Sequence, residues 1–328
     1  MQQHINSMEV LAATISWHTR KSIPYLFAVD FEMNEAYFTD YPQQQQEILF
    51  RTPLMTNMAA AKHIEKSVAL TAQPMSFEDY KKGFNIVHQG LLYGNSYLTN
   101  YTTRTPIDCC LSIREIAMSS TAPFVLCIPN KFVCFSPERF VQIKDGFVTT
   151  HPMKGTIDAA LPNAEQRLLA DPKELAEHIT VVDLLRNDIG IIADEVEVSR
   201  FRYLSRIETQ HGAILQMSSA ITGRLPSNAM SHLGELLLRL LPAGSICGAP
   251  KESTLKLIAE AENHSRGFYS GIFGVFDGQS FDSAVMIRFI EEDTHQQLYF
   301  HSGGGITVNS HAETEYNEMI QKIYLSLA

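Results

Sequence analysis

Short apolar runs separated by turn residues fill the chain between residues 122 and 150. The runs cover residues 122–128, 131–135, 139–143 and 147–150, and only two or three residues separate one run from the next. Closely spaced runs of this length are typical of strands joined in hairpins. We therefore predict an antiparallel meander in this part of the chain.

Helical spacing of apolar residues begins on the amino-terminal side of the meander. Ser76 and Asp79 form a capping pattern, and apolar residues then recur every three or four positions, at Tyr80, Phe84, Val87 and Leu91. This pattern predicts a helix that begins at Ser76 and ends near Gly94. Asp171 as a cap and Pro172 in the first turn likewise predict a helix over residues 172–187.

The remaining pattern mixes strands and helices. It predicts further helices at 229–241, 250–262 and 312–327, and strands at 191–199, 214–221, 269–276, 281–290 and 296–302. Strands cluster in hairpins and helices fall between the clusters, which indicates an α+β fold rather than a parallel βαβ sheet. We expect residues 1–75 to form a short amino-terminal region packed on a main body of residues 76–328, the two making one structural unit.

The composition is that of an ordinary globular protein, with 328 residues, 45% hydrophobic and 19% charged. The sequence shows neither an apolar run of about 18 residues nor a signal peptide, so we expect a cytoplasmic protein that does not bind a membrane. The five cysteines include no CxxC pair, which argues against a zinc site. The net charge of −10 disfavours nucleic-acid binding, and an anionic substrate would need a local cation to offset this field.

Lys154 is the first candidate for chemistry. It follows the apolar stretch 147–150, within the segment His151–Thr156, at the expected end of a strand. An amine becomes a nucleophile when burial or a neighbouring cation lowers its pKa. A solvated lysine in a turn bounded by Pro152 and Gly155 is the common alternative, and this residue alone does not exclude it.

Two pairs of carboxylates recur at helical spacing. Glu174 and Glu177 share a face of the helix predicted over 172–187, and Glu315 and Glu318 share a face of the last helix, four residues before Lys322. Like charges at this spacing destabilise a helix slightly unless water solvates them. Either both faces are solvated, or the two helices face each other and present carboxylates to a hard cation such as Mg²⁺.

Three further features carry candidate binding groups. Gly303, Gly304 and Gly305 follow a predicted strand, where they form either a flexible loop or a nest of N–H groups that binds an anion. Arg288 lies among the apolar residues of the strand predicted over 281–290, as a surface residue or a clamp for a carboxylate. Glu138 lies in a predicted hairpin turn, where burial would make it a general acid.

Eight segments, taken in order, resemble the chorismate-utilising enzymes, which include component I of anthranilate synthase and of aminodeoxychorismate synthase and the isochorismate and salicylate synthases. The segments are Ser136–Glu138, Pro152–Thr156, Glu174–His178 with Val182–Asp188, Pro242–Lys251, Arg266–Tyr269, Ile287–Arg288, Ser302–Ile306 and Glu315–Glu318. Each segment alone is weak, and their common order over residues 76–328 makes the resemblance specific.

This resemblance implies two orthogonally packed, mainly antiparallel sheets flanked by helices, with chorismate bound between them. It implies Mg²⁺ held by Glu177 and Glu318, with Glu174 and Glu315 in support. The glycine run and Thr156 would hold the ring carboxylate of chorismate. Arg288 and Tyr269 would hold the enolpyruvyl carboxylate, with assistance from Lys322.

Lys154 separates members of the family. The segment Pro152–Thr156 resembles the Pro-x-Lys-Gly-Thr segment of aminodeoxychorismate synthases, whereas the corresponding segment of anthranilate synthases resembles Pro-x-Ala-Gly-Thr. The resemblance therefore implies amination of chorismate at C4 for p-aminobenzoate and folate synthesis, with Lys154 as covalent nucleophile and Glu138 as acid. Anthranilate synthase component I is the nearest alternative. An isochorismate or salicylate synthase and a non-catalytic metabolite-binding subunit are more distant ones.

The chain also departs from the family pattern. Leu98 stands where ammonia-using members have glutamine, Gln216 replaces a histidine, and Cys247 replaces a threonine or serine. The tryptophan-binding motif of the family is not found before residue 76. No Gly-x-Cys-x-Gly elbow of a glutaminase occurs, so we expect a separate glutamine amidotransferase subunit to supply ammonia.

Overall fold

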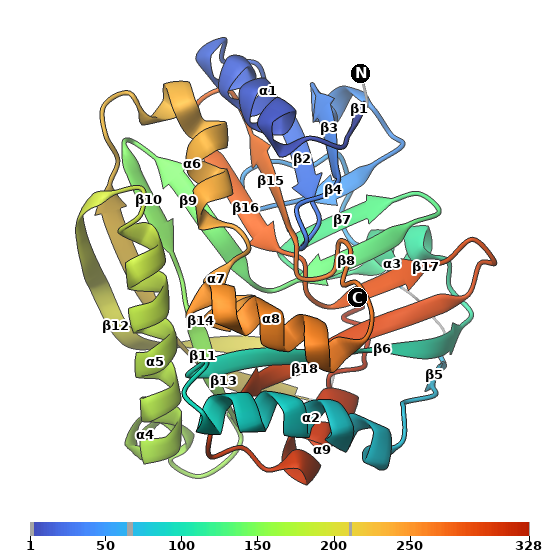
Figure 1. Cartoon of the computed structure of the whole chain (residues 1–328). Coiled ribbons are helices and arrows are strands. Elements are labelled where there is room, and N and C mark those ends of the chain that lie inside the picture. Colours follow the sequence, from blue (N-terminus) through green and yellow to red (C-terminus); the bar gives the residue numbers. More distant parts are fainter. Residues whose placement is uncertain (1–2, 64–67, 210–211, 328) are drawn as a thin grey trace.

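Two antiparallel sheets form the body of the protein in this computed structural model, which describes residues 3–63, 68–209 and 212–327 (Figure 1). Within these residues the first sheet has the strands β1 (Gln3–Ile5), β2 (Tyr25–Val29), β3 (Ala36–Asp40), β9 (Arg139–Lys144), β10 (Phe147–Thr150), β11 (Met153–Asp158), β12 (Asp194–Thr209), β13 (Gly212–Arg224), β15 (Ile272–Phe276) and β16 (Phe281–Val285). The second has β4 (Leu49–Arg51), β5 (Leu70–Ala72), β6 (Leu98–Cys109), β7 (Phe124–Ile128), β8 (Phe132–Ser136), β14 (Gly248–Ala249), β17 (Phe289–Glu292) and β18 (Leu298–Ile306).

Helices lie outside both sheets, as Figure 1 shows. They are α1 (Met8–Arg20), α2 (Phe77–Leu92), α3 (Ile113–Ser119), α4 (Ala164–Ala170), α5 (Pro172–Ile189), α6 (Leu233–Leu240), α7 (Gly244–Cys247), α8 (Lys251–Glu262) and α9 (Ala312–Gln321), with 3₁₀ turns at Pro42–Gln44 and Ala229–His232. The predicted α+β class with two antiparallel sheets is confirmed. None of the helices in the described ranges has the length and apolar character that crossing a bilayer demands.

Within the described residues, buried apolar side chains form four clusters around the sheets. In β15, Phe273 and Val275 pack between the two sheets, whereas Ile272 and Phe276 point to the opposite face, against the core formed with α1, α5 and α6. A fully buried side chain of this size contributes about 1.5–3 kcal/mol. Because both faces of the strand are covered, its sequence is a continuous apolar run rather than an alternating one.

The first 75 residues contribute strands to both sheets. In the first sheet β2 pairs with β15 in register Ile272↔Val29, and in the second sheet β4 pairs with β7. Helix α1, which the sequence did not predict, begins at the cap Ser7 and buries Leu11 and Ile15. The division of the chain at residue 75 stays a prediction.

Several predicted elements have different bounds in the structure. The strand predicted over 191–199, for example, is β12, which continues to Thr209. The meander is divided, because β7 and β8 pair in the second sheet and β9 and β10 in the first. The predicted strand 281–290 is likewise two strands in two sheets. The strand predicted over 296–302 continues to Ile306, and the last helix ends at Gln321 rather than residue 327. After that helix the chain runs extended, and Leu327 bridges to Ser120.

Two of the connections that pass between the sheets lie side by side. Residues 137–138 connect β8 to β9, and residues 286–288 connect β16 to β17. The two connections are bonded to each other, since the Phe135 N–H donates to the Arg288 carbonyl at 3.0 Å and the Val285 N–H donates to the Glu138 carbonyl at 3.2 Å. This contact fixes the backbone of Glu138 next to that of Arg288.

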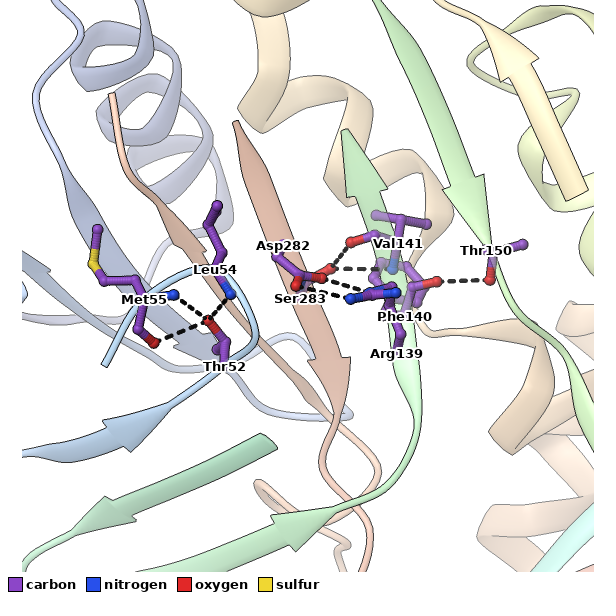
Figure 2. Close-up of polar contacts among 9 residues, drawn as sticks. All are labelled: Thr52, Leu54, Met55, Arg139, Phe140, Val141, Thr150, Asp282 and Ser283. Carbon is purple, nitrogen blue, oxygen red and sulfur yellow. Dashed lines mark hydrogen bonds and ion pairs between the residues drawn. The ribbon is translucent and has the colours of Figure 1, made fainter. Parts of the chain in front are cut away.

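Buried polar contacts hold the strands beside this crossing (Figure 2). Arg139 donates two hydrogen bonds to the fully buried carboxylate of Asp282, at 2.8 and 3.1 Å. The register of β9 and β16 shifts there, and the Ser283 hydroxyl accepts from the Val141 N–H and donates to the Val141 carbonyl in place of a regular ladder. The residue after Glu138 is therefore anchored in the core.

Candidate active site

One cavity of about 770 Å³ collects most of the predicted site residues. It lies where the crossing connections, the edge of β18 and the helices α5, α7 and α9 meet. The predicted residues that line it are Glu138, Lys154, Glu177, Tyr269, Arg288, Gly303, Gly304, Gly305, Glu315 and Lys322. Thr156, Glu174 and Glu318 do not line it, and Thr156 is exposed on β11. The structure thus brings together ten of these thirteen residues, which come from distant parts of the chain.

A β-bulge presents Lys154 to this cavity. The register between β11 and β13 shifts between Met153 and Thr156, and Gly155 has φ 91°, which favours glycine. A side chain at residue 155 would also meet Glu174 at 2.7 Å. The bulge leaves Lys154 Nζ 2.8 Å from Glu177 Oε2, with the lysine side chain half-buried.

The charge environment of Lys154 differs from the sequence-based expectation. Burial lowers the pKa of Lys154, but Glu177 and, less strongly, Glu318 and Glu174 raise it by more, so the pKa lies above its ordinary value. Lys154 is therefore an ammonium ion in this state. The sequence could not reveal this, because Glu318 belongs to a helix more than 150 residues away.

The four glutamates come from α5 and α9. Asp171 caps α5 by accepting from the N–H groups of Lys173 and Glu174, which fixes the first turn that carries Glu174 and Glu177. In α9 the Ser310 hydroxyl donates to Glu315 Oε1 at 2.8 Å. Burial raises the pKa of both Glu174 and Glu315, with neighbouring carboxylates adding to the rise.

Lys322 joins α9 to the glycine run. Its Nζ lies 2.7 Å from Glu318 Oε1 and donates to the Gly303 carbonyl at 2.8 Å. Burial raises the pKa of Glu318, but Lys322 and, less strongly, Lys154 and Lys173 together lower it by more, so this carboxylate stays ionised.

The glycine run is part of a strand, not a loop. Gly303, Gly304 and Gly305 pair with β6 and have no positive φ, so they do not form the predicted nest. β17 pairs with β18 only as far as His301, so the edge beyond it is open. Thr102, opposite Gly303, donates its N–H to Glu262, away from β18, and the Gly303 carbonyl meets Lys322. By the alternation of an antiparallel ladder, the N–H groups of Gly303 and Gly305 point out from this open edge, toward the cavity.

Glu138 and Arg288 lie where the chain crosses between the sheets. Arg288 has φ 52°, so it interrupts the strand in which the sequence placed it, and its Nε donates to the Tyr324 hydroxyl at 3.3 Å. Burial raises the pKa of Glu138, although Ser245 and Arg288 oppose this. A carboxyl group with a raised pKa facing a cavity is suited to general-acid chemistry.

Sequence reasoning missed the residue that touches Glu138. Ser245, in the short helix α7, donates its hydroxyl to Glu138 Oε1 at 2.8 Å and lines the cavity. Asp188 fixes the start of α7 by accepting from the Gly244 N–H at 3.1 Å, and Lys251 pairs with the same carboxylate. The sequence feature that could have pointed to Ser245 is the Gly/Pro-rich segment 242–251, but the same composition is equally typical of an ordinary loop before a helix.

Comparison with known proteins identifies the family. Over residues 13–328 the sequence matches the family described as chorismate binding enzyme.

The chain belongs to this family. It is 43% identical over 322 residues to an "uncharacterized PabA-like protein" of Haemophilus influenzae, with 98% of both chains covered. A protein of the same description from Pasteurella multocida is 48% identical over 305 residues, covering 92% of this chain and 94% of that one. Aminodeoxychorismate synthase component 1 of Klebsiella aerogenes is 34% identical over 263 residues, which are 76% of this chain but only 57% of that protein.

Solved structures agree on the fold of this chorismate-binding enzyme. Anthranilate synthase component I of Streptococcus pneumoniae superposes with a TM-score of 0.73 at 22% identity, covering 98% of this chain and 85% of that one. A structure described as a 2,3-dihydroxybenzoate-specific isochorismate synthase from Bacillus anthracis gives the same TM-score at 19% identity, covering 98% and 89%. At these identities the likeness concerns the fold alone.

Two departures from the family pattern lie in the cavity itself. Leu98 and Gln216 both line it, and a side chain at Gly305 would meet Leu98 Cδ1 at 2.9 Å. Leu98 thus places an apolar side chain beside the open edge of β18. Cys247 is fully buried next to Ser245 and Ile246 and does not line the cavity.

The carboxylates of α5 and α9 have the right chemistry for Mg²⁺, a hard cation that often takes one or two carboxylates together with water and an anionic substrate. Within the described ranges, no three acidic, His or Cys side chains converge tightly enough to hold a metal by themselves. Glu177 and Glu318 instead pair with Lys154 and Lys322, and Lys154 is influenced by both carboxylates. Two carboxylates that are each paired with a cation fit a site that water and substrate complete.

Proposed function

We propose that this protein aminates chorismate at C4 to give 4-amino-4-deoxychorismate, using ammonia from a glutamine amidotransferase subunit, for p-aminobenzoate and folate synthesis. The observation that carries the proposal is that Lys154 and Glu138 line one cavity. A primary amine and a carboxyl group with a raised pKa are the nucleophile and the acid that two successive allylic displacements need.

In the first displacement the neutral amine of Lys154 forms a bond to C2 of chorismate. Both ring double bonds shift, from C1=C2 and C5=C6 to C1=C6 and C4=C5, and the C4 hydroxyl leaves as water after Glu138 donates its proton. The ammonium of Lys154 must lose a proton before this step, because its pKa is raised in the substrate-free protein. The Ser245 hydroxyl already occupies Glu138 Oε1, which leaves Oε2 to face the leaving group.

In the second displacement ammonia adds at C4, both double bonds shift back, and the C2–N bond to Lys154 breaks. The departing amine takes the proton that the ammonia nitrogen releases and returns a proton to Glu138. When both displacements have the same facial sense, ammonia enters on the face that the hydroxyl left, and the configuration at C4 is retained. The enolpyruvyl ether stays intact throughout, and Gln216, in place of the family's histidine, agrees with a product that keeps this group.

Substrate carboxylates have matching donors around the cavity. Arg288 and Tyr269 line one part of it, where they would hold the enolpyruvyl carboxylate. The outward N–H groups of β18 and Lys322 would hold the ring carboxylate, a role that Thr156 shares only if β11 moves, because Thr156 is exposed here. Mg²⁺, held by Glu177 and Glu318 with Glu174 and Glu315 in support, would supply positive charge beside that carboxylate.

A product assay with chorismate, Mg²⁺ and ammonium tests this function. We expect p-aminobenzoate only when aminodeoxychorismate lyase is added, and no fluorescent anthranilate. Anthranilate as the product would show component I of anthranilate synthase instead, and isochorismate or salicylate would show a water-using enzyme. With the cognate amidotransferase added, glutamine should replace ammonium as the nitrogen source. If glutamine does not support the reaction, the predicted partner is wrong.

A further inference from the structure

The two glutamates proposed to hold Mg²⁺ each carry a lysine as a close ion-pair partner. Lys154 Nζ is 2.8 Å from Glu177 Oε2, and Lys322 Nζ is 2.7 Å from Glu318 Oε1. Both lysine side chains are partly buried, with 35% and 26% of their surface exposed. The Glu177 side chain is 25% exposed, so the first pair is partly shielded from water and stronger than a surface pair, whereas the Glu318 side chain is 48% exposed and water screens the second pair more.

We infer that Lys154 and Lys322 are the resident cations of the metal site, neutralising Glu177 and Glu318 in the metal-free protein and yielding both carboxylates to Mg²⁺. The inference rests on the magnesium site of the proposed function. It gives these lysines a second role, in the metal-free protein, besides the roles in catalysis and substrate binding proposed above. Two positive side chains would keep the clustered carboxylates of α5 and α9 together until the metal arrives.

Competition follows from the chemistry of the donors. Each lysine contacts one oxygen of its carboxylate, at Glu177 Oε2 and Glu318 Oε1. Mg²⁺ at about 2.1 Å from either oxygen of the same carboxylate would lie close to the ammonium group, and the two cations repel each other. The lysine contacts and the metal contacts therefore oppose each other. By linkage, whatever free energy the ion pairs contribute to the metal-free state is subtracted from the affinity for Mg²⁺.

Lys173 supplies a matched control on the same carboxylate. Its Nζ lies 3.8 Å from Glu177 Oε1, and 72% of its side chain is exposed. It adds the same charge to the region but makes no short contact, and solvent screens it. A general effect of net charge would make Lys173 resemble Lys154, whereas direct occupation of the carboxylate would separate the two.

The experiment is a calorimetric titration of Mg²⁺ into chelator-treated protein without chorismate, for the wild type, Lys154→Met, Lys322→Met, Lys154→Arg and Lys173→Met. We expect Lys154→Met and Lys322→Met each to bind Mg²⁺ about tenfold more tightly, which corresponds to about 1.4 kcal/mol. Lys154→Arg keeps the charge and should stay within about threefold of the wild type, and Lys173→Met within about twofold.

Thermal unfolding supplies a second readout. Without metal, Lys154→Met should have a lower Tm than the wild type, because Glu177 loses its partner and repels its neighbours, and Mg²⁺ should raise its Tm by more. Unchanged or weaker Mg²⁺ binding by both methionine variants would overturn the inference, as would an equal gain in Lys173→Met.

The outcomes also separate this inference from the proposed function. If the Mg²⁺ affinity is the same in the wild type and in the lysine variants, the competition is wrong, but the proposed amination is not affected. Tighter binding in the methionine variants combined with anthranilate as product supports the competition and overturns the proposed function. If neither the wild type nor any variant binds Mg²⁺, both the competition and the magnesium site are wrong.

Discussion

The cavity has two ends that are built in different ways. At the crossing end, Glu138 and Arg288 lie on backbone segments that are hydrogen-bonded to each other and anchored by the buried Arg139–Asp282 pair. At the carboxylate end, the groups are long side chains of α5, α9 and β11 held mainly by ion pairs. The first end positions an acid and an arginine through covalent and main-chain constraints, whereas the second can exchange one set of charged partners for another.

The largest expected effect comes from removing the amine at the exchangeable end. Lys154→Ala should lower kcat for ammonia-dependent amination by about 10³-fold or more, because no other group would form the covalent adduct. Mass spectrometry of wild-type enzyme quenched during turnover should detect the adduct on Lys154. Lys173→Ala, which alters a neighbouring exposed lysine, should stay within about threefold. No adduct, together with wild-type rates for Lys154→Ala, would exclude a covalent role.

The acid at the crossing end should dominate the pH profile. Glu138→Gln keeps the size of the side chain but cannot donate a proton, so kcat should fall about 10²–10⁴-fold. Glu138 has a raised pKa and acts when protonated, so its deprotonation lowers kcat/KM as pH rises. Lys154 must be neutral to react and its pKa lies above its ordinary value, so its deprotonation raises kcat/KM only at high pH. Glu138→Gln should remove the first dependence and leave kcat/KM rising with pH, and a profile equal to that of the wild type would argue against Glu138 as the acid.

The sequence predicts the residues at the two ends of the cavity better than it predicts their arrangement and charge. Eight short segments in a common order were enough to predict the family, the two-sheet fold and ten of the residues that line the cavity. They could not show that the segment 281–290 leaves one sheet and enters the other, because an apolar alternation looks the same in either sheet. Nor could they show that Gly303–Gly305 form an edge, since pairing with β6 joins residues about 200 positions apart. The protonation of Lys154 depends on equally distant charges.

The different roles proposed for Glu177 and Glu174 in binding Mg²⁺ give a sharper test of the carboxylate end. Glu177 lines the cavity, whereas Glu174 lies against Gly155 and does not line it. If Glu177 is a direct ligand and Glu174 a supporting one, Glu177→Gln should weaken Mg²⁺ binding by about 10–100-fold and Glu174→Gln by only a few-fold. Calorimetry measures both, and circular dichroism checks that α5 is intact. Equal losses in the two variants would mean that the carboxylates act only through their total charge.

The glycine run lies between the two ends, and its residues should differ in what they tolerate. A Cβ at Gly303 would lie 2.4 Å from the Tyr101 carbonyl and 2.7 Å from Thr102 Cα, which are backbone atoms that cannot move without separating β18 from β6. A Cβ at Gly304 would meet only side-chain atoms, with Lys322 Nζ at 3.4 Å and Glu315 Oε2 at 3.6 Å. We therefore expect Gly303→Ala to lower the free energy of unfolding by about 1–3 kcal/mol. Gly304→Ala should leave it within about 0.5 kcal/mol and leave Mg²⁺ affinity within about twofold, because these distances are ordinary van der Waals contacts that require no group to shift. Chemical denaturation and calorimetry on the pair measure the two effects separately, and a stability loss in Gly304→Ala as large as that in Gly303→Ala would show that the carboxylate end is as rigid as the sheets.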